Sequence, residues 1–258
     1  MTKKRILVTG AGGFIGAHLV RMLTNDKYDV HQLSHADGDI ADTKISAKNI
    51  DHVFHLAAKT FVPDSWSNPV DFYKTSTMGT LRVLEFCREQ GCSLTFNSTY
   101  VYGNQKQMPI SEEASIDAAA PYHHSKILAE DLCRFYASKY NVSVTVLRPF
   151  NIYGPGQRDM FLIPKLVKQI FDPAKASIEV FDLKPKRDYL YVEDLVRAMI
   201  ATIEKKGFAV YNVGFGKSYG VDQVIRSIFE ASGFHKKIES LQAQRPSEIL
   251  DTQADISK

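Results

Sequence analysis

The sequence has 258 residues, of which 44% are hydrophobic and 24% charged, with a formal net charge of +3. This is the composition of a globular protein with a large core, and the weak net charge argues against nucleic-acid binding. No apolar stretch is long enough to cross a bilayer, so we expect no membrane contact. The three cysteines lack the spacing of metal ligands and are odd in number, which predicts reduced thiols in a cytoplasmic protein and no metal site.

The first predicted elements surround a glycine-rich turn. Residues 5–9 form an apolar run, and apolar residues from Ile15 onward recur with the period of a half-buried helix. Between them, Gly10, Gly13 and Gly16 stand three residues apart. Glycines let the backbone turn tightly, approach a diphosphate and bring helix and strand close together, and the helix start favours an anion. A ligand-free glycine turn is the alternative, but a position between strand and helix favours a dinucleotide site.

Strands and helices then alternate along the first half of the chain, which predicts an α/β protein with a doubly wound parallel sheet. Only a brief polar segment separates the second and third strands, so any helix between them should be short. Gly91 should end the long helix that is predicted at about 70–89. The expected elements are a strand at 28–33, a strand at 53–57, a loop at 66–69, a helix at about 70–89, a strand at 94–97, a helix at 121–140 and a strand at 142–147.

The second half also mixes strands and helices, without repeats, low-complexity tracts or a flexible linker. Because no linker separates the halves, we expect the second half to interleave with the first. The expected elements are a helix at 161–171, a strand at 178–181, a helix at 192–204, a strand at 210–213 and a helix at 221–231.

Three side chains carry the predicted chemistry. Tyr122 and Lys126 stand four residues apart at a predicted helix start, and therefore on one face. A free tyrosine has a pKa of about 10, but a neighbouring ammonium and a cationic nicotinamide ring would both favour the phenolate. Ser98 follows a predicted strand and could share a substrate hydroxyl with Tyr122. The tyrosine–lysine spacing occurs by chance on many helices, but its combination with the glycine turn and the serine is a specific signal.

Further stretches extend this pattern over nearly the whole sequence. They are residues 9–16, 38–40, 55–58, 79–80, 98–103, Tyr122 with Lys126, 148–156, 187–189 and 245–246. In this order they resemble the NAD-dependent epimerase/dehydratase family of extended short-chain dehydrogenase/reductases, whose substrates are mostly nucleotide sugars. The match is specific for the family and unspecific for the substrate.

The resemblance implies a Rossmann fold in which residues 1–150 form the dinucleotide-binding domain and residues 151–258 form mainly a substrate-binding lobe. It implies NAD as cofactor, with NADP also open, and a nucleotide sugar as substrate. The implied catalytic residues are Ser98, Tyr122 and Lys126. The implied cofactor contacts are Gly10, Gly13, Phe14, Ile15, Gly16, Ser34, Asp39, Ile40, Leu56, Ala57, Ala58, Tyr122 and Lys126. The implied substrate contacts are Ser65, Thr99, Asn151, Arg187 and Arg245.

Departures from the family pattern bear on the reaction. NAD-specific members carry an acidic residue at the end of the second strand, but here that place falls near Ser34 and His35. Neither a carboxylate to repel a 2′-phosphate nor an arginine to bind one is expected there. Dehydratases of the family carry an acidic pair where this chain has Thr99 and Tyr100, which argues against a 4,6-dehydratase. Family members usually continue beyond residue 258, so the lobe is either cut short or naturally small.

The favoured function is therefore a nucleotide-sugar epimerase acting at C4. Tyr122 takes the proton of the 4-hydroxyl while hydride passes to the nicotinamide and later returns to the opposite face. A 4-ketoreductase or dehydrogenase with net hydride transfer stays open as the alternative, and a non-catalytic dinucleotide-binding scaffold is a remote one. Because family members pair through two long helices, here about 70–90 and 121–140, we also expect a homodimer.

Overall fold

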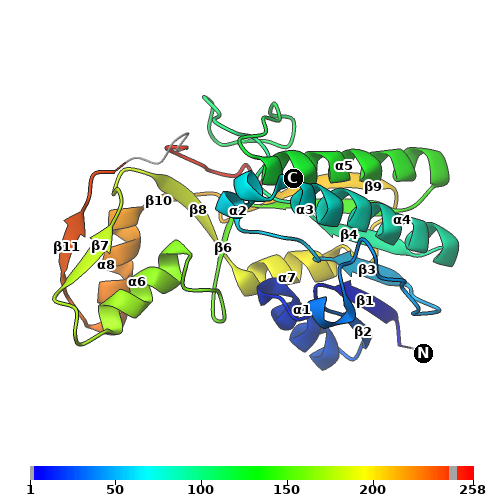
Figure 1. Cartoon of the computed structure of the whole chain (residues 1–258), viewed down its shortest axis with the longest axis horizontal. Coiled ribbons are helices and arrows are strands. Elements are labelled where there is room, and N and C mark those ends of the chain that lie inside the picture. The colour runs from blue at the N-terminus through cyan, green and yellow to red at the C-terminus, as the bar shows by residue number, and fades with distance from the viewer. Residues whose placement is uncertain (1–2, 244–248) are drawn as a thin grey trace.

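Six parallel strands form the central sheet in the computed structural model, which describes residues 3–243 and 249–258 (Figure 1). They stand in the order β2-β1-β3-β4-β5-β9, and all neighbours run parallel. The order reverses between β1 and β3, which places a ligand crevice at the carboxyl ends of these strands. The predicted doubly wound sheet is confirmed. The strands are β1 Arg5–Thr9, β2 Asp29–Leu33, β3 His52–His55, β4 Ser93–Asn97, β5 Val144–Pro149 and β9 Phe208–Val213.

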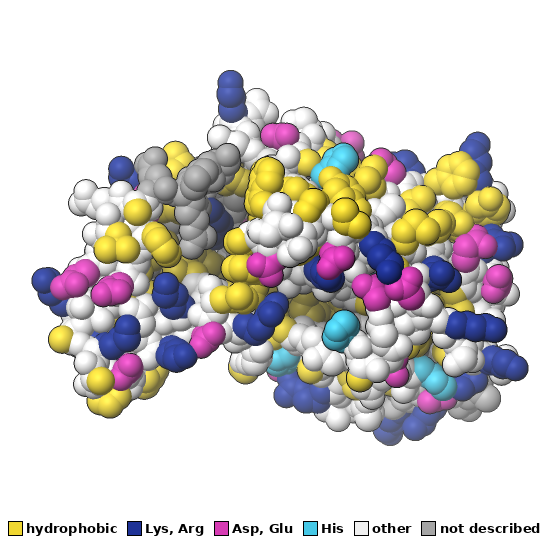
Figure 2. Space-filling view, viewed as in Figure 1, with side chains coloured by type: hydrophobic (Ala, Val, Ile, Leu, Met, Phe, Trp, Pro, Cys, Tyr) yellow, Lys and Arg dark blue, Asp and Glu magenta, His cyan; other side chains and the backbone are white. Residues whose placement is uncertain are grey.

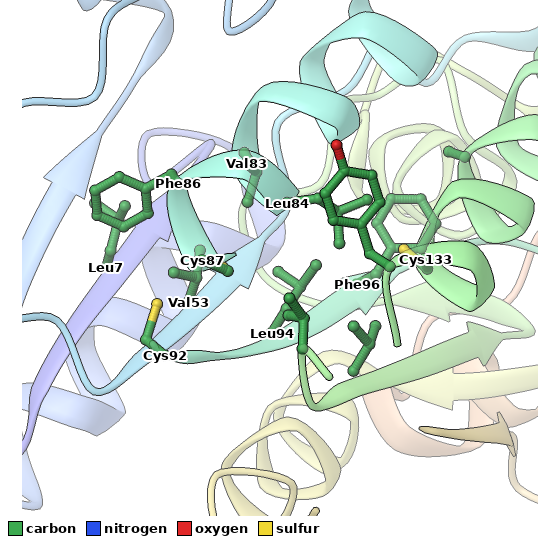
Figure 3. Packing of buried hydrophobic residues seen from close by; sticks show 14 of the residues in the cluster. Leu7, Val53, Val83, Leu84, Phe86, Cys87, Cys92, Leu94, Phe96 and Cys133 are labelled. Atoms are coloured by element: carbon green, nitrogen blue, oxygen red, sulfur yellow. The ribbon is translucent and has the colours of Figure 1, made fainter. Parts of the chain in front are cut away.

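Helices cover both faces of this sheet. They include α1 (Phe14–Asn25), α4 (Gly79–Gln90), α5 (Pro121–Tyr140) and α7 (Val192–Ala201). Alternate strand residues point to opposite faces. Leu7, Leu84 and Phe96 belong to the cluster beneath α4 and α5 (Figure 3), whereas Ile6 and Val8, next to Leu7 in the chain, belong to the cluster with α1 and α7. The sheet is therefore buried on both sides, as the continuous apolar runs in its strands require.

The predicted helix at about 70–89 is confirmed, but it contains a π-helical turn and a further short helix precedes it. Helices α2 (Val62–Ser67) and α3 (Pro69–Tyr73) precede a π-helical turn, η2 (Lys74–Met78), and only then does α4 begin. Helix α2 has only six residues and no side-chain cap, and the π turn is a single irregular turn inside a longer helix, so neither has a clear sequence signal. The expected stop is confirmed, because Gly91 caps α4 in the left-handed conformation with φ of 69°.

The second half forms a smaller unit beside the sheet, drawn at the left of Figure 1. A separate cluster of buried apolar side chains holds this unit together, with residues from α6 (Leu162–Phe171), β7 (Ser177–Val180) and α8 (Val221–Ser232). The chain returns to the main unit through α7 and β9, and β9 is the edge strand of the central sheet. The predicted strand at 178–181 and helices at 161–171 and 221–231 are confirmed. The elements are α6 Leu162–Phe171, β7 Ser177–Val180 and α8 Val221–Ser232, with the unpredicted strands β6 Asn151–Tyr153, β8 Lys186–Tyr191, β10 Ser218–Gly220 and β11 Lys237–Ser240.

Asp188 ties the smaller unit to the main sheet. Its fully buried carboxylate accepts hydrogen bonds from the backbone N–H groups of Phe215, Gly216 and Ala254. Burial raises the pKa of Asp188, and these three donors oppose that shift. One side chain on β8 thus holds the segment after β9 and the segment near the chain end together, which fixes the base of the smaller unit.

Candidate functional site

The glycine turn after β1 (residues 10–16, the glycine cradle) packs closely against neighbouring backbone. Gly10 has φ of +71°, and a Cβ there would lie 2.7 Å from the backbone nitrogen of Ala57. A Cβ on Gly16 would overlap the carbonyl oxygen of Gly10. Gly13 caps α1 without any side-chain hydrogen bond, so the N–H groups of the first helical turn remain available to an anion. The predicted residues Phe14 and Ile15 occupy that same first turn, half-buried.

A buried histidine fixes the loop that faces this cradle. His55 Nδ1 lies 2.7 Å from Thr9 Oγ1, and His55 Nε2 lies 3.1 Å from Thr80 Oγ1. Thr9 Oγ1 also accepts the N–H of Ala57 at 3.3 Å. Burial lowers the pKa of His55 to about 3, so the neutral ring offers one donor and one acceptor to the two threonines. These hydrogen bonds of His55 and Thr9 fix the backbone path of residues 56–58, which are predicted cofactor contacts.

The end of β2 carries a carboxylate that the sequence analysis did not expect. The short 3₁₀ turn η1 (His35–Asp37) folds back so that Asp37 accepts hydrogen bonds from the Ser34 N–H at 2.8 Å and the Ser34 hydroxyl at 3.0 Å. These bonds lower the pKa of Asp37. The expectation of no acidic group near Ser34 and His35 is therefore wrong, because the turn brings back a residue that lies three positions later in the sequence.

The next predicted cofactor residues brace the loop after this turn. Asp39 accepts hydrogen bonds from the Ala41 N–H and from the Thr75 hydroxyl, both at 2.9 Å. Ile40 is buried against the helix, where a Cβ on Gly79 would lie only 2.5 Å from its Cγ2 atom. The loop is thus anchored to η2 and to the start of α4, which explains why a glycine stands at the head of that helix.

Helix α5 brings two of the predicted catalytic side chains into the protein interior. Tyr122 is 8% and Lys126 is 3% exposed. The Lys126 Nζ donates to the backbone oxygen of Asn97 at 3.0 Å, next to Ser98 at the end of β4, and lies 4.7 Å from the centroid of the Phe96 ring. Burial lowers the pKa of Lys126 to about 8. The lysine is therefore fixed beside the serine by a backbone atom and a ring.

The tyrosine and the serine have different partners in this arrangement. Burial raises the pKa of Tyr122, and a hydrogen bond with the Thr99 side chain partly opposes that rise. Ser98 instead donates its hydroxyl proton to Glu130 at 2.5 Å. Thr99 is one of the predicted substrate contacts, whereas Glu130 is not among the predicted site residues. Its spacing from Tyr122 and Lys126, at successive intervals of four residues, was the available signal.

The predicted substrate contacts are more dispersed. Ser65 is fully buried and donates to the Val62 carbonyl oxygen in its own helix at 2.6 Å. Asn151 is half-buried on β6, and Arg187 lies on the adjacent strand β8. Arg187 also lowers the pKa values of two half-buried tyrosines, at 100 and 189, against the stronger effect of desolvation, and so lies near both. Arg245 lies outside the described residues.

The chain is similar to one family of known proteins over most of its length. The profile of the NAD dependent epimerase/dehydratase family matches residues 6–214. The chain belongs to this family. A protein of Bacillus subtilis (strain 168) named as an uncharacterized UDP-glucose epimerase is 31% identical over 98% of this chain and 90% of its own length. The GDP-6-deoxy-D-mannose reductase of Pseudomonas aeruginosa is also 31% identical, over 95% of this chain and 84% of its own.

A solved structure shares the fold closely. The UDP-N-acetylglucosamine 4-epimerase of Methanobrevibacter ruminantium, in complex with UDP-N-acetylmuramic acid, superposes with a TM-score of 0.91. It is 27% identical, and the match covers all of this chain and 91% of that one. The extended short-chain dehydrogenase/reductase assignment is thereby confirmed, and the chain is an enzyme of an NAD-dependent family. Within the described residues, no helix is long and apolar enough to cross a membrane.

The buried lysine should make stability depend on pH. A lysine whose pKa falls from about 10.5 unfolded to about 8 folded destabilises the protein while it is charged, and this penalty shrinks as the pH rises between those values. Between pH 8 and pH 9.5 we expect the wild-type free energy of unfolding to rise by about 1–2 kcal/mol more than that of Lys126→Met. Urea unfolding of both proteins at the two pH values measures this difference. Parallel pH dependences would show that Lys126 is not desolvated.

Proposed function

We propose that the protein is a nucleotide-sugar epimerase acting at C4. The observation that carries this proposal is the burial of Tyr122 and Lys126 on one face of α5, beside the end of β4 that bears Ser98. The glycine cradle and the loop held by His55 meet at the same edge of the sheet, at the carboxyl ends of β1 and β3. Positions for a dinucleotide and for a proton-transfer group therefore adjoin.

The residues of the cradle fit a bound NAD. Gly10, Gly13 and the first turn of α1 would hold its diphosphate, and Asp37 would accept hydrogen bonds from the hydroxyls of the adenosine ribose. When bound, NAD supplies the hydride acceptor for C4 and returns the hydride to the opposite face. The predicted cofactor contacts other than Tyr122 and Lys126 lie in the segments that follow β1, β2 and β3.

The chain's own residues handle the proton. Tyr122, as phenolate, takes the proton of the 4-hydroxyl while C4 loses its hydride, and it gives the proton back when the alcohol forms again. Its ordinary pKa is too high for this role, and burial raises it further, so a positive charge must enter the site. Lys126 supplies part of that charge, and the cationic nicotinamide ring supplies more. Ser98 holds the reacting oxygen beside Tyr122.

The choice of an epimerase rests on the residues after Ser98 and on the relatives. Thr99 and Tyr100 stand where dehydratases of the family have acids, and the Tyr100 hydroxyl donates to the Gly103 carbonyl oxygen at 2.5 Å. Neither of these two side chains is an acid that could serve in water loss. The epimerase names of the relatives support a nucleotide-sugar substrate with UDP. The reductase relative keeps a 4-ketoreductase as the second candidate.

A panel of UDP-, dTDP-, GDP- and CDP-sugars tests the proposal. We expect one sugar to be converted to its C4 epimer without net change in the absorbance of reduced nicotinamide. Tyr122→Phe should lower kcat by about a hundredfold to ten-thousandfold, because it removes the proton-transfer group. Tyr136→Phe, on the same helix and bonded to Glu85 instead, is the matched control. Stoichiometric loss of NADH or NADPH would identify a reductase, and silence of the whole panel would indicate a scaffold.

The carboxylate at the end of β2 predicts a preference for NAD over NADP. Asp37 would lie beside the adenosine ribose, where its charge repels a 2′-phosphate. Asp37→Asn should raise the NADP-to-NAD ratio of kcat/KM by at least about tenfold, since it removes that charge. Asp42→Asn, an exposed neighbour paired with Lys74, is the control and should leave the ratio unchanged. An unaltered ratio in Asp37→Asn would contradict the role of this side chain.

We also propose a homodimer formed through α4 and α5. Hydrophobic side chains gather on the face over α2 to α5 (Figure 2), among them Val70, Phe135 and Tyr140, which are 75%, 50% and 49% exposed. Light scattering should give twice the mass of the chain, and Phe135→Glu should return the monomer mass. Phe171→Glu, at an equally exposed phenylalanine of the smaller unit, should leave the dimer intact. A monomer in the wild-type protein would exclude this pairing.

The location in the cell also stays a prediction. Cys87, Cys92 and Cys133 are free and buried in the same cluster (Figure 3). Burial raises the pKa of the Cys133 thiol. Buried, protonated thiols are typical of proteins in a reducing compartment, which supports the cytoplasm.

A further inference from the structure

Glu130 lies two helical turns beyond Tyr122 on α5 and binds the hydroxyl of Ser98. The Ser98 Oγ and Glu130 Oε1 atoms are 2.5 Å apart, and the residues are only 2% and 5% exposed. Tyr122, Lys126 and Glu130 follow at intervals of four residues and so share one face of the helix. Glu130 therefore lies on the same helix face as the two predicted catalytic residues of α5 and contacts the third, Ser98.

A buried arginine decides the polarity of this contact. Arg148 is 2% exposed and pairs with Glu130 through its Nε atom, 3.1 Å from both carboxylate oxygens, and its Nη2 atom, 2.6 Å from Oε2. A guanidinium only donates hydrogen bonds, and the carboxylate paired with it only accepts them. In the contact with Glu130, Ser98 must therefore be the donor.

The arginine is itself held in place from other elements. Its Nη1 atom donates to the Tyr102 hydroxyl at 3.0 Å, and that hydroxyl donates to Asn212 Oδ1 at 2.5 Å. The Asn212 N–H in turn donates to Glu112 at 2.8 Å. Side chains from the loop after β4, from β5 and from β9 thus fix the carboxylate, so the Ser98 proton is directed to a fixed acceptor inside the protein.

We propose that Glu130 is a positioning residue that makes Ser98 a hydrogen-bond acceptor toward the substrate. This inference rests on the proposed epimerase function. With its proton held by Glu130, Ser98 can accept from the substrate alcohol in a three-centre contact shared with Tyr122. A ketone forms when C4 loses its hydride and the proton of the 4-hydroxyl passes to Tyr122. Ser98 then has no proton to donate to the ketone oxygen. The ketone oxygen then has Tyr122 as its donor, without a second one from Ser98, and a weakly held ketone turns over more easily.

Glu130→Gln reverses this polarity. The amide oxygen must face Arg148, which has only donors, so the amide nitrogen faces Ser98 and frees the serine proton for the ketone. In the full chain with NAD and the nucleotide sugar that it converts, we expect kcat to fall about tenfold while KM changes little. We also expect a larger steady-state absorbance of reduced nicotinamide, because the ketone is held more tightly. A merely structural role would not raise that absorbance.

A double-mutant cycle with Ser98→Ala isolates the effect. In the alanine background, Glu130→Gln should change kcat less than twofold and leave the absorbance unaltered. Glu85→Gln is the matched control, since Glu85 also accepts from an arginine and a hydroxyl, at Arg88 and Tyr136, far from Ser98. Thermal unfolding of each variant identifies any misfolded protein. If Glu130→Gln does not fold, Glu130→Asp serves instead, because it keeps a charge for Arg148 but withdraws the carboxylate from Ser98.

The outcomes separate the two proposals. An equal loss of kcat in the serine and alanine backgrounds, or an unaltered absorbance in Glu130→Gln, would overturn the positioning role while the epimerase function stands. A wild-type protein that converts no nucleotide sugar would contradict the proposed function, and this inference with it. Loss confined to the serine background, together with the raised absorbance, supports both.

Discussion

The site depends on one steric constraint, which is the lack of a Cβ atom at Gly10 and Gly16. A Cβ on Gly10 would lie 2.7 Å from the Ala57 nitrogen, and one on Gly16 would overlap the Gly10 carbonyl oxygen. Only without these atoms can α1 start directly on top of β1 and the loop after β3 pass close beside it. That approach brings the anion-binding helix start and the loop held by His55 to the same edge of the sheet. The positions of the other site residues follow from this edge.

Polar side chains, more than apolar ones, fix the parts of the site that face the ligand. His55 joins β1 to α4 through two threonines, and Asp188 joins β8 to two distant segments. Glu130 and Arg148 join α5 to β5 in the same way. Each of these groups is buried, so leaving one of them without its hydrogen-bond partner would cost more free energy than the bond itself contributes to stability. Such contacts specify one arrangement where apolar packing alone would tolerate several.

Sequence patterns predicted the sheet, the covering helices and the glycine turn, because these follow from the period of apolar residues and from glycine spacing. They could not show Asp37, since only the backbone of η1 returns its carboxylate to Ser34. Nor could they show that Ser98 donates to Glu130, because a hydroxyl's partner depends on how a strand end meets a helix. The strands β6 and β10 were missed because three residues carry no measurable alternation.

The distribution of charge along α5 explains why its lysine is poised for a ligand. Arg148 contacts both carboxylate oxygens of Glu130, so this acid, four residues after Lys126, is paired with the arginine and not with the lysine. Among the described residues, the Lys126 ammonium has the Asn97 carbonyl oxygen and the Phe96 ring as its partners, and burial lowers its pKa to about 8. A charge desolvated in this way gains free energy from any hydroxyl or anionic group that enters beside it. Because Arg148 pairs with Glu130, the ammonium of Lys126 can interact with a ligand under the proposed function.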